Sequence, residues 1–438
     1  MINTRYIAAR HLLCVALAAW AASAGSAIAQ AINNAPTLRE VLQAVNQSTE
    51  VRIARQVQVG AEADVLTADH APLPVLSSKL SQIDLQTGLG AGDWIGRKRI
   101  DKGVGLDWTY ERGDKRALRT HAAQRTVAAT AAEAQEAVLQ QMLTAQAAYY
   151  DWLAARERVQ LVVSLAEAGR EAVRAAQTRL GAGDLSQQDT SRIEIDAARV
   201  AADKQSAQLD LSRATIALSK VLNGADIAAI PVGNIAWPEL PKAAATAGPS
   251  TEIGNASAAA AINARADVRA ARERINAAKA NLDGAYALQK TDPTIGISFD
   301  HYPGTSTRLI ELRVQIPLTW GYSYQGEKAR AQSDLRQAEL TEERVLRDAR
   351  TELARLYEEA DSLTQRTAAF ETDIVPRAAQ VASQAEFAYR RGALSLIDLL
   401  DARRTLRTTQ LEVLVARTDL AKARTALLLR TAPELLVR

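Results

Sequence analysis

The side chains in this sequence that could do chemistry together are carboxylates placed just after serines. Ser186 precedes Asp189 by three residues, and Ser395 precedes Asp398 by the same interval. This is the spacing of a capping box, in which such side chains satisfy free backbone N–H groups at a helix N-terminus. Asp401 lies one helical turn beyond Asp398 and has no such capping role. It is the carboxylate that local helix chemistry leaves unexplained.

No catalytic motif accompanies these carboxylates. The sequence has no glycine-rich phosphate loop, no HExxH pair and no nucleophile elbow. His70, His121 and His301 are too scattered to suggest a metal-ligand cluster, and the one cysteine is Cys14. We therefore predict that the chain is not an enzyme and has neither a metal site nor a cofactor.

The two serine–aspartate pairs are predicted to lie where very long helices end and the next helices begin. Residues Lys115 to Leu180 lack proline, and apolar or small residues recur there at steps of three and four. Such a helix is roughly 100 Å long at a rise of about 1.5 Å per residue. Residues Glu327 to Tyr389 repeat the pattern, with Pro376 as an expected break or kink. Shorter helices are predicted over about Thr37–Ala68 and about Ala258–Leu288.

The second half of the chain repeats the first. Three matches occur in the same order, with the separation drifting slowly from 217 to 213 to 209 residues: Glu50–Arg55 with Asp267–Arg272, Gly113–Lys115 with Gly326–Lys328, and Gly183–Asp189 with Gly392–Asp398. We therefore predict a first structural repeat over residues 30–223 and a second over residues 258–438. Residues 224–257 contain four prolines and are predicted to form a linker.

The N-terminus and the composition place the chain outside the cytoplasm. Arg5 and Arg10 precede an apolar run that ends in Ala27-Ile28-Ala29, so residues 1–29 are predicted to be a secretory signal peptide. The mature chain then has no cysteine and can persist in an oxidising compartment without disulfide chemistry. The 53 basic and 50 acidic side chains nearly balance, so no nucleic-acid partner is implied.

Four runs have the alternation of strands with one apolar and one polar face. They are residues Pro74–Gln86, Gly103–Tyr110, Thr294–Asp300 and Arg308–Pro317. The apolar side chains are predicted to face lipid: Val104, Leu106, Trp108, Ile295, Ile297, Phe299, Ile310, Leu312, Val314 and Ile316. Because four strands cannot close a barrel, this interpretation requires several chains to share one. The alternative is a water-soluble β-domain with its core on one side.

Two stretches resemble the TolC family of outer-membrane efflux proteins, and the similarity covers nearly the whole mature chain. They are Tyr389–Leu406, which reads YRRGALSLIDLLDARRTL, and Val314–Leu318 running into the helix start at Gly326. The resemblance implies a mainly α fold with a small β part and a homotrimer. Long antiparallel coiled-coil hairpins, in two tandem repeats, would form a periplasmic α-barrel. Four strands from each protomer would form a shared β-barrel in outer-membrane lipid, and the linker would lie in an equatorial belt.

The resemblance also assigns roles to the two turns. Their residues would contact a periplasmic adaptor (membrane fusion) protein: Gly183, Leu185, Ser186, Gly392, Leu394 and Ser395. We expect Leu185 and Leu394 to be exposed there, unless they pack inside their own turns. Asp398 and Asp401 match the family's periplasmic gate, where three copies of each would form cation-favouring acidic rings.

The implied function is that of a passive exit duct for substrates delivered by an inner-membrane pump. Gly113–Arg116 and Tyr324–Arg330 look like the branch that serves heavy-metal cation efflux, which implies a pump of the resistance-nodulation-division type. Drugs are the other cargo considered. Two alternatives stay open: the exit duct of a type I protein-secretion system, and a periplasmic coiled-coil protein that is not a channel. A periplasmic adaptor is disfavoured because adaptors carry one hairpin, whereas two in tandem are predicted here.

Overall fold

The computed structural model describes residues 35–83, 100–224, 237–239, 252–303 and 305–437, so the predicted signal peptide lies outside the described residues. The chain divides into two compact units, and each takes segments from both halves of the sequence. The first unit comprises the residues up to Ile53, Glu136–Asn263 and Ala349–Arg438, and the second comprises Ala54–Gln135 and Ala264–Asp348.

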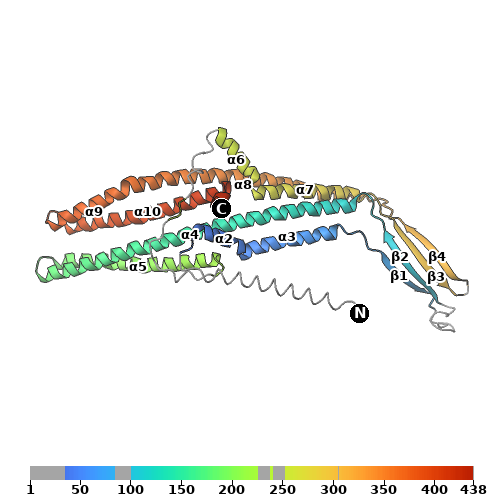
Figure 1. The fold of residues 1–438 in the computed structure, drawn as a ribbon, viewed down its shortest axis with the longest axis horizontal. Coiled ribbons are helices and arrows are strands. Elements are labelled where there is room, and N and C mark those ends of the chain that lie inside the picture. The colour runs from blue at the N-terminus through green and yellow to red at the C-terminus, as the bar shows by residue number, and fades with distance from the viewer. Residues whose placement is uncertain (1–34, 84–99, 225–236, 240–251, 304, 438) are drawn as a thin grey trace, which may run out of the picture. The chain divides into compact units, whose positions relative to one another are not determined.

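The fold is mainly helical, as predicted. The helices are α2 (Leu38–Ala44), α3 (Thr49–Ala68), α4 (Lys115–Gly181), α5 (Gln187–Val221), α6 (Glu252–Ala264), α7 (Ala266–Ala287), α8 (Gln325–Ala369), α9 (Val375–Arg390), α10 (Leu396–Thr431) and α11 (Glu434–Val437). In the first unit, α4 with α5 and α9 with α10 form two helical hairpins (Figure 1). The helix predicted over Lys115–Leu180 is confirmed, since α4 has 67 residues.

The helix predicted over Thr37–Ala68 is broken, and the prediction of one continuous helix is wrong. A 3₁₀ turn follows α2, and Ser48 then adopts an extended conformation with ψ of 151°. The Ser48 hydroxyl accepts a hydrogen bond from the Val51 N–H at 3.3 Å and so starts α3. The second repeat breaks at the equivalent residue: Arg265, 217 positions later, has ψ of 142° and separates α6 from α7.

The break predicted at Pro376 is confirmed. A π-helical segment, Phe370–Ile374, separates α8 from α9, and the proline lies in the first turn of α9. Proline has no N–H to donate and its ring crowds the carbonyl four residues earlier, so the regular hydrogen-bond ladder cannot run through it. The wider π turn accommodates this defect without ending the helical path.

The four strands form one antiparallel sheet in the order β1-β2-β3-β4 (Figure 1). They are β1 (Val75–Ser81), β2 (Asp101–Thr109), β3 (Thr294–Tyr302) and β4 (Ser306–Gln315). All four strands were predicted. Ile316, expected inside the last strand, lies one residue beyond it, because Pro317 cannot donate to a ladder. The predicted end of the first run, from residue 84, lies outside the described residues.

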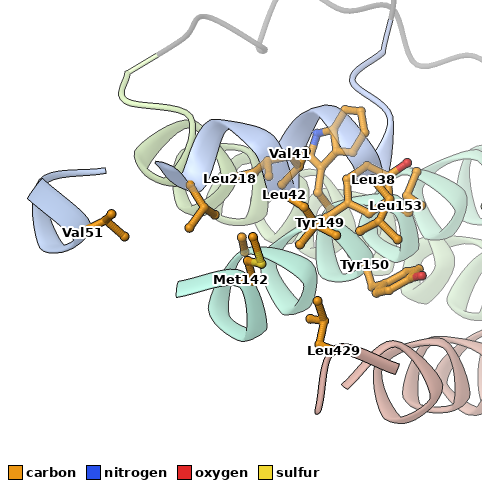
Figure 2. Close-up of a cluster of buried hydrophobic side chains, with 13 residues drawn as sticks. Leu38, Val41, Leu42, Val51, Met142, Tyr149, Tyr150, Leu153, Leu218 and Leu429 are labelled. Carbon is orange, nitrogen blue, oxygen red and sulfur yellow. The ribbon is translucent and has the colours of Figure 1, made fainter. Parts of the chain in front are cut away.

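The core of the first unit brings together residues from both ends of the chain. Leu38, Val41 and Leu42 of α2 pack with Tyr149 and other side chains of α4, and with Leu218 and Leu429 (Figure 2). A capping box starts α2: the Glu40 N–H donates to the Thr37 hydroxyl at 3.3 Å and the Thr37 N–H donates to the Glu40 carboxylate at 2.8 Å.

Candidate functional site

The sheet exposes its apolar face and covers its polar one. The three apolar side chains on each of β2 and β3 are about half exposed, and on β4 the exposed fraction reaches 76% at Leu312. On the opposite face, Asp300 is only 3% exposed. This is the reverse of a sheet with an aqueous surface, in which the apolar face is the covered one. Every side chain predicted to face lipid is exposed in this chain.

A salt bridge spans the polar face across a glycine. Arg313 of β4 donates to Asp107 of β2 at 2.7 Å, although β3 lies between them. The register pairs Asp107 with Gly296, and Gly296 with Arg313, so all three share one row. A Cβ at Gly296 would collide with the Asp107 carboxylate. The missing side chain is therefore what lets the two charges meet.

Both hairpins of the first unit end in the same backbone motif. The left-handed glycines are Gly183, with φ of +82°, and Gly392, with φ of +75°. The next N–H in each turn donates to a carbonyl five residues earlier: Asp184 to Arg179 at 2.9 Å, and Ala393 to Ala388 at 2.9 Å. These are Schellman motifs, which need a residue with positive φ and so favour glycine. The sequence prediction of two equivalent tight reversals is confirmed.

The serine caps are also equivalent in the two turns. The Ser186 hydroxyl accepts from the Asp189 N–H at 3.0 Å and donates to the Asp189 carboxylate at 2.8 Å. The Ser395 hydroxyl does the same with Asp398, at 3.2 Å and 2.7 Å. Asp398 is thus tied to its cap, which is the structural role that the spacing predicts.

Asp401 differs from its counterpart in the first repeat. The separation of 209 residues aligns it with Arg192, which lies 3.5 Å from the capping carboxylate Asp189. In α10 the equivalent position holds Asp401, so a second carboxylate follows Asp398 one helical turn later. Asp401 is exposed and forms no hydrogen bond or ion pair with any residue that the structure describes.

The two predicted tip leucines are half-buried, which favours the alternative that they pack at their turns over the one that they are exposed. Leu185 packs against Ala176, Ile193 and Leu396, and Leu394 packs against another cluster that contains Leu399. Each leucine directly precedes the N-cap serine of the next helix, and Leu394 packs with Leu399 at the fourth position of α10, as in a hydrophobic staple. Ile397, one residue into α10, is the large apolar side chain exposed at the second turn, at 55%. The exposure of Ile397 could have been predicted from the sequence, because it follows Leu396, which faces the core, and precedes the polar Asp398.

The tips of the two hairpins lie together. Leu396 of α10 shares a cluster with Ile193 of α5, and the Arg179 guanidinium lies 5.8 Å from the ring centre of Tyr389. Further along, Arg407 of α10 contacts Asp196 of α5 at 3.7 Å.

A cavity of about 370 Å³ separates the hairpins beyond these contacts, lined by α4, α5, α9 and α10. Glu386 and Arg403 line this cavity and lie 3.4 Å apart, and the Glu386 carboxylate also accepts a hydrogen bond from Arg390 at 2.6 Å. The hydrogen bond from Arg390, with the charge of Arg403, holds the pKa of Glu386 below its usual value. This charge cluster joins α9 to α10 within one hairpin, whereas the Arg407–Asp196 pair joins the two hairpins.

Two further observations limit the chemistry of the chain. Within the described part, no group of three His, Cys, Asp or Glu side chains could hold a metal ion. None of the described helices has an apolar stretch long enough to cross a membrane.

Known proteins share this arrangement. No model of a protein family matches the sequence. The cobalt-zinc-cadmium resistance protein CzcC of Cupriavidus metallidurans is 26% identical over 303 residues, which cover 68% of each chain. The outer-membrane channel OprN superposes with a TM-score of 0.76 at 19% identity, over 92% of both chains. A membrane protein from Pseudomonas aeruginosa gives 0.76 at 17% identity, over 90% of this chain and 93% of that one. The chain therefore has the fold of outer-membrane channel proteins, and the resemblance to the TolC family of outer-membrane efflux proteins is confirmed.

Proposed function

We propose that this chain is the outer-membrane channel of a tripartite efflux system and acts as a passive exit duct. It sits in the outer membrane of a Gram-negative cell with its helices in the periplasm. An inner-membrane pump and a periplasmic adaptor supply the substrate and the energy, since no nucleotide-binding motif occurs in the sequence.

The observation that carries the proposal is the exposed apolar face of the sheet. Leu106, Ile297 and Leu312 lie side by side on three strands, about half exposed or more. At roughly 25 cal/mol for each square ångström of apolar surface, lipid contact over such a face is strongly favourable. The opposite face, with its Asp107–Arg313 bridge, suits a wet lumen.

The sheet edges support a barrel shared by several chains, for which we propose a trimer. β1 and β4 are the two outer strands of the sheet and each pairs on one side alone. In hydrocarbon, a row of unpaired N–H and C=O groups costs several kcal/mol for each group, so an open sheet does not persist there. Three copies that join β4 of one protomer to β1 of the next would pair every edge and close a twelve-stranded barrel.

The tips support a gate that opens on docking. Three copies of the unpaired Asp401, with Asp398 one turn away, would line a narrow mouth with carboxylates that repel one another as it closes. The adaptor would contact the exposed parts of the turns, namely Gly183, Ser186, Gly392 and Ser395, together with Ile397. Leu185 and Leu394 would act from within, by holding the shape of each turn.

The cargo proposed first is divalent metal cations. CzcC is named for cobalt, zinc and cadmium resistance, and it matches over 68% of the chain. Acidic rings at the mouth would concentrate cations. The structure offers a specific metal site in none of its described residues, which suits a duct that conducts and does not store.

The test is made on purified protein in planar bilayers, with chemical cross-linking of the same sample. The proposal expects a cross-linked trimer and single-channel conductance that favours cations. A folded monomer without conductance would contradict it and would favour the periplasmic coiled-coil alternative.

A second assay addresses cargo. A strain without the gene is grown with cobalt, zinc or cadmium, and the assay is repeated with drugs. Sensitivity to metals alone supports the first cargo, and loss of a secreted protein without metal sensitivity would favour the type I secretion alternative.

A further inference from the structure

The charges on the apolar face of the sheet are confined to one row. On that face, Lys102 of β2 pairs directly with His301 of β3. Arg308 of β4 extends the row, because it adjoins Leu309, which pairs with Asp300. Side chains alternate along a strand, so these three lie on the side of Val104, Phe299 and Ile310, and His301 sits at the irregularity in the β3–β4 register between Asp300 and Tyr302. They form a basic row that borders the apolar belt.

The sign of the charge differs between the two faces. The polar face carries both signs, with Asp101, Asp107, Asp300 and Glu311 beside Lys79 and Arg313. By the same registers, the apolar face holds no acidic side chain at any described strand position. A face exposed only to water would be expected to carry both acidic and basic side chains, as the polar face does. An apolar belt bordered by a purely basic row fits an amphiphile, whose acyl chains would contact the belt and whose anionic headgroup would contact the row.

The apolar belt has a defined length along the strands. From Lys102 to Trp108 is six residues, or about 20 Å along the strand at ~3.4 Å each. Beyond Trp108 the face continues to the exposed Tyr110, whose ring packs edge-on at 6.4 Å from Trp108. Aromatic rings of this kind mark a lipid–water interface. The apolar belt thus has an aromatic border at one end and a basic border at the other.

The basic row lies at the end of the sheet where β3 turns into β4, between Tyr302 and Ser306. The other end of the strands leads to the helices α4 and α8 (Figure 1). With the helices in the periplasm, as the proposed function has them, the row reaches the outer leaflet.

We propose that the row formed by Lys102, His301 and Arg308 binds the phosphate groups of an acylated, phosphorylated glycolipid of that leaflet; this rests on the proposed function. Lys102 and Arg308 supply permanent charge. The Nδ1 of His301 lies 3.0 Å from the Thr307 carbonyl oxygen, which can only accept, so Nδ1 carries the hydrogen. Nε2 is the ring nitrogen that this hydrogen bond leaves for the lipid headgroup. Each cation near an anionic surface contributes about fivefold in affinity.

The test uses lipid A as the probe, in its bisphosphorylated and dephosphorylated forms. The purified full chain is inserted into phosphatidylcholine nanodiscs that contain one form or the other, and bound lipid is counted by native mass spectrometry. We expect the bisphosphorylated form to be retained more than about tenfold better. The variant Lys102→Gln/His301→Gln/Arg308→Gln should bring that ratio close to one.

The matched control is Arg52→Gln/Arg344→Gln/Arg350→Gln, which removes three basic side chains from exposed helix positions. It should keep the preference of the wild type. If the control lost the preference for bisphosphorylated lipid A to the same extent, the preference would depend on overall charge and the inference would be overturned. Full competition by inorganic phosphate would also overturn it, since that points to a free-anion site.

Failure of the inference is distinguishable from failure of the proposed function. A protein that inserts and conducts without any preference for phosphorylated lipid A would remain a channel and would lack this lipid site. A folded protein that fails to insert into nanodiscs of either composition would contradict the membrane proposal itself.

Discussion

Asp401 of α10 occupies the position that Arg192 holds in α5. Both lie three residues after a capped aspartate, Asp398 in one hairpin and Asp189 in the other. Arg192 neutralises its neighbour at 3.5 Å, whereas Asp401 adds a second negative charge. The two repeats share the glycine turn and the serine cap, but one helical turn later the side chain is positively charged in α5 and negatively charged in α10.

Changing Asp401 to Arg recreates the charge arrangement of α5 and should abolish cation preference. The side chain is exposed and is not used in capping, so the fold should be kept. Reversal potentials of the trimer in a salt gradient across a planar bilayer measure the selectivity. Asp398→Asn is the comparison, because it removes one charge next to the cap. If the cation selectivity of the Asp401→Arg variant is unaltered, Asp401 is an ordinary surface residue and does not line the gate.

Replacing Gly392 with Ala should destabilise the second turn by about 1 kcal/mol. Its φ is +75° and nothing lies within 4 Å of the added Cβ, so the cost is purely conformational. Gly181→Ala is the matched control: its added Cβ also meets nothing within 4 Å, but it lies within the last turn of α4 without positive φ. That variant should be neutral or slightly stabilising. Urea unfolding followed by circular dichroism compares them, and equal effects would contradict the argument.

Gly296→Ala should weaken the barrel, because its Cβ displaces the Asp107 carboxylate from Arg313. Gel mobility of unheated samples across a temperature series reports the loss of the assembled form. Gly60→Ala, whose Cβ meets nothing within 4 Å, is the control. In a variant that already carries Asp107→Ala, the change at Gly296 should cost much less. A full effect there would mean that the bridge is not the reason.

Alkaline solution should destabilise the first unit between about pH 10 and pH 12. Burial raises the pKa of Tyr149 and of Tyr150 to about 12, from 10.0. Between those values the unfolded chain loses the phenolic protons and the folded chain keeps them, so stability falls as the pH rises. Tyr150→Phe should flatten this decline, and it should cost about 1 kcal/mol at neutral pH through loss of the 2.9 Å hydrogen bond with Thr425. Tyr110→Phe, at an exposed site, should leave the slope unchanged.

Sequence periodicity predicted the long elements well because it integrates many residues. The span of α4 and the two glycine turns follow from apolar spacing and from a conformation that glycine favours. The breaks at Ser48 and Arg265 were missed because each depends on a single ψ angle, at residues that are neither proline nor glycine. The sequence left open whether Leu185 is exposed or packed, because one of its partners, Leu396, lies more than 200 residues away. Roles assigned to the gate and to the tips stay predictions.

Leu38 and Leu429, which share one cluster, lie near opposite ends of the chain. That core cannot close until translation has passed the last turns of α10, which carry both Leu429 and the buried Arg430 with its bonds to Glu136 and Glu352. A growing polypeptide thus lacks the contacts that would lock it into a finished shape. The predicted signal peptide implies export of an unfolded chain, and a core that needs both Leu38 and Leu429 would then form only after export of that whole span.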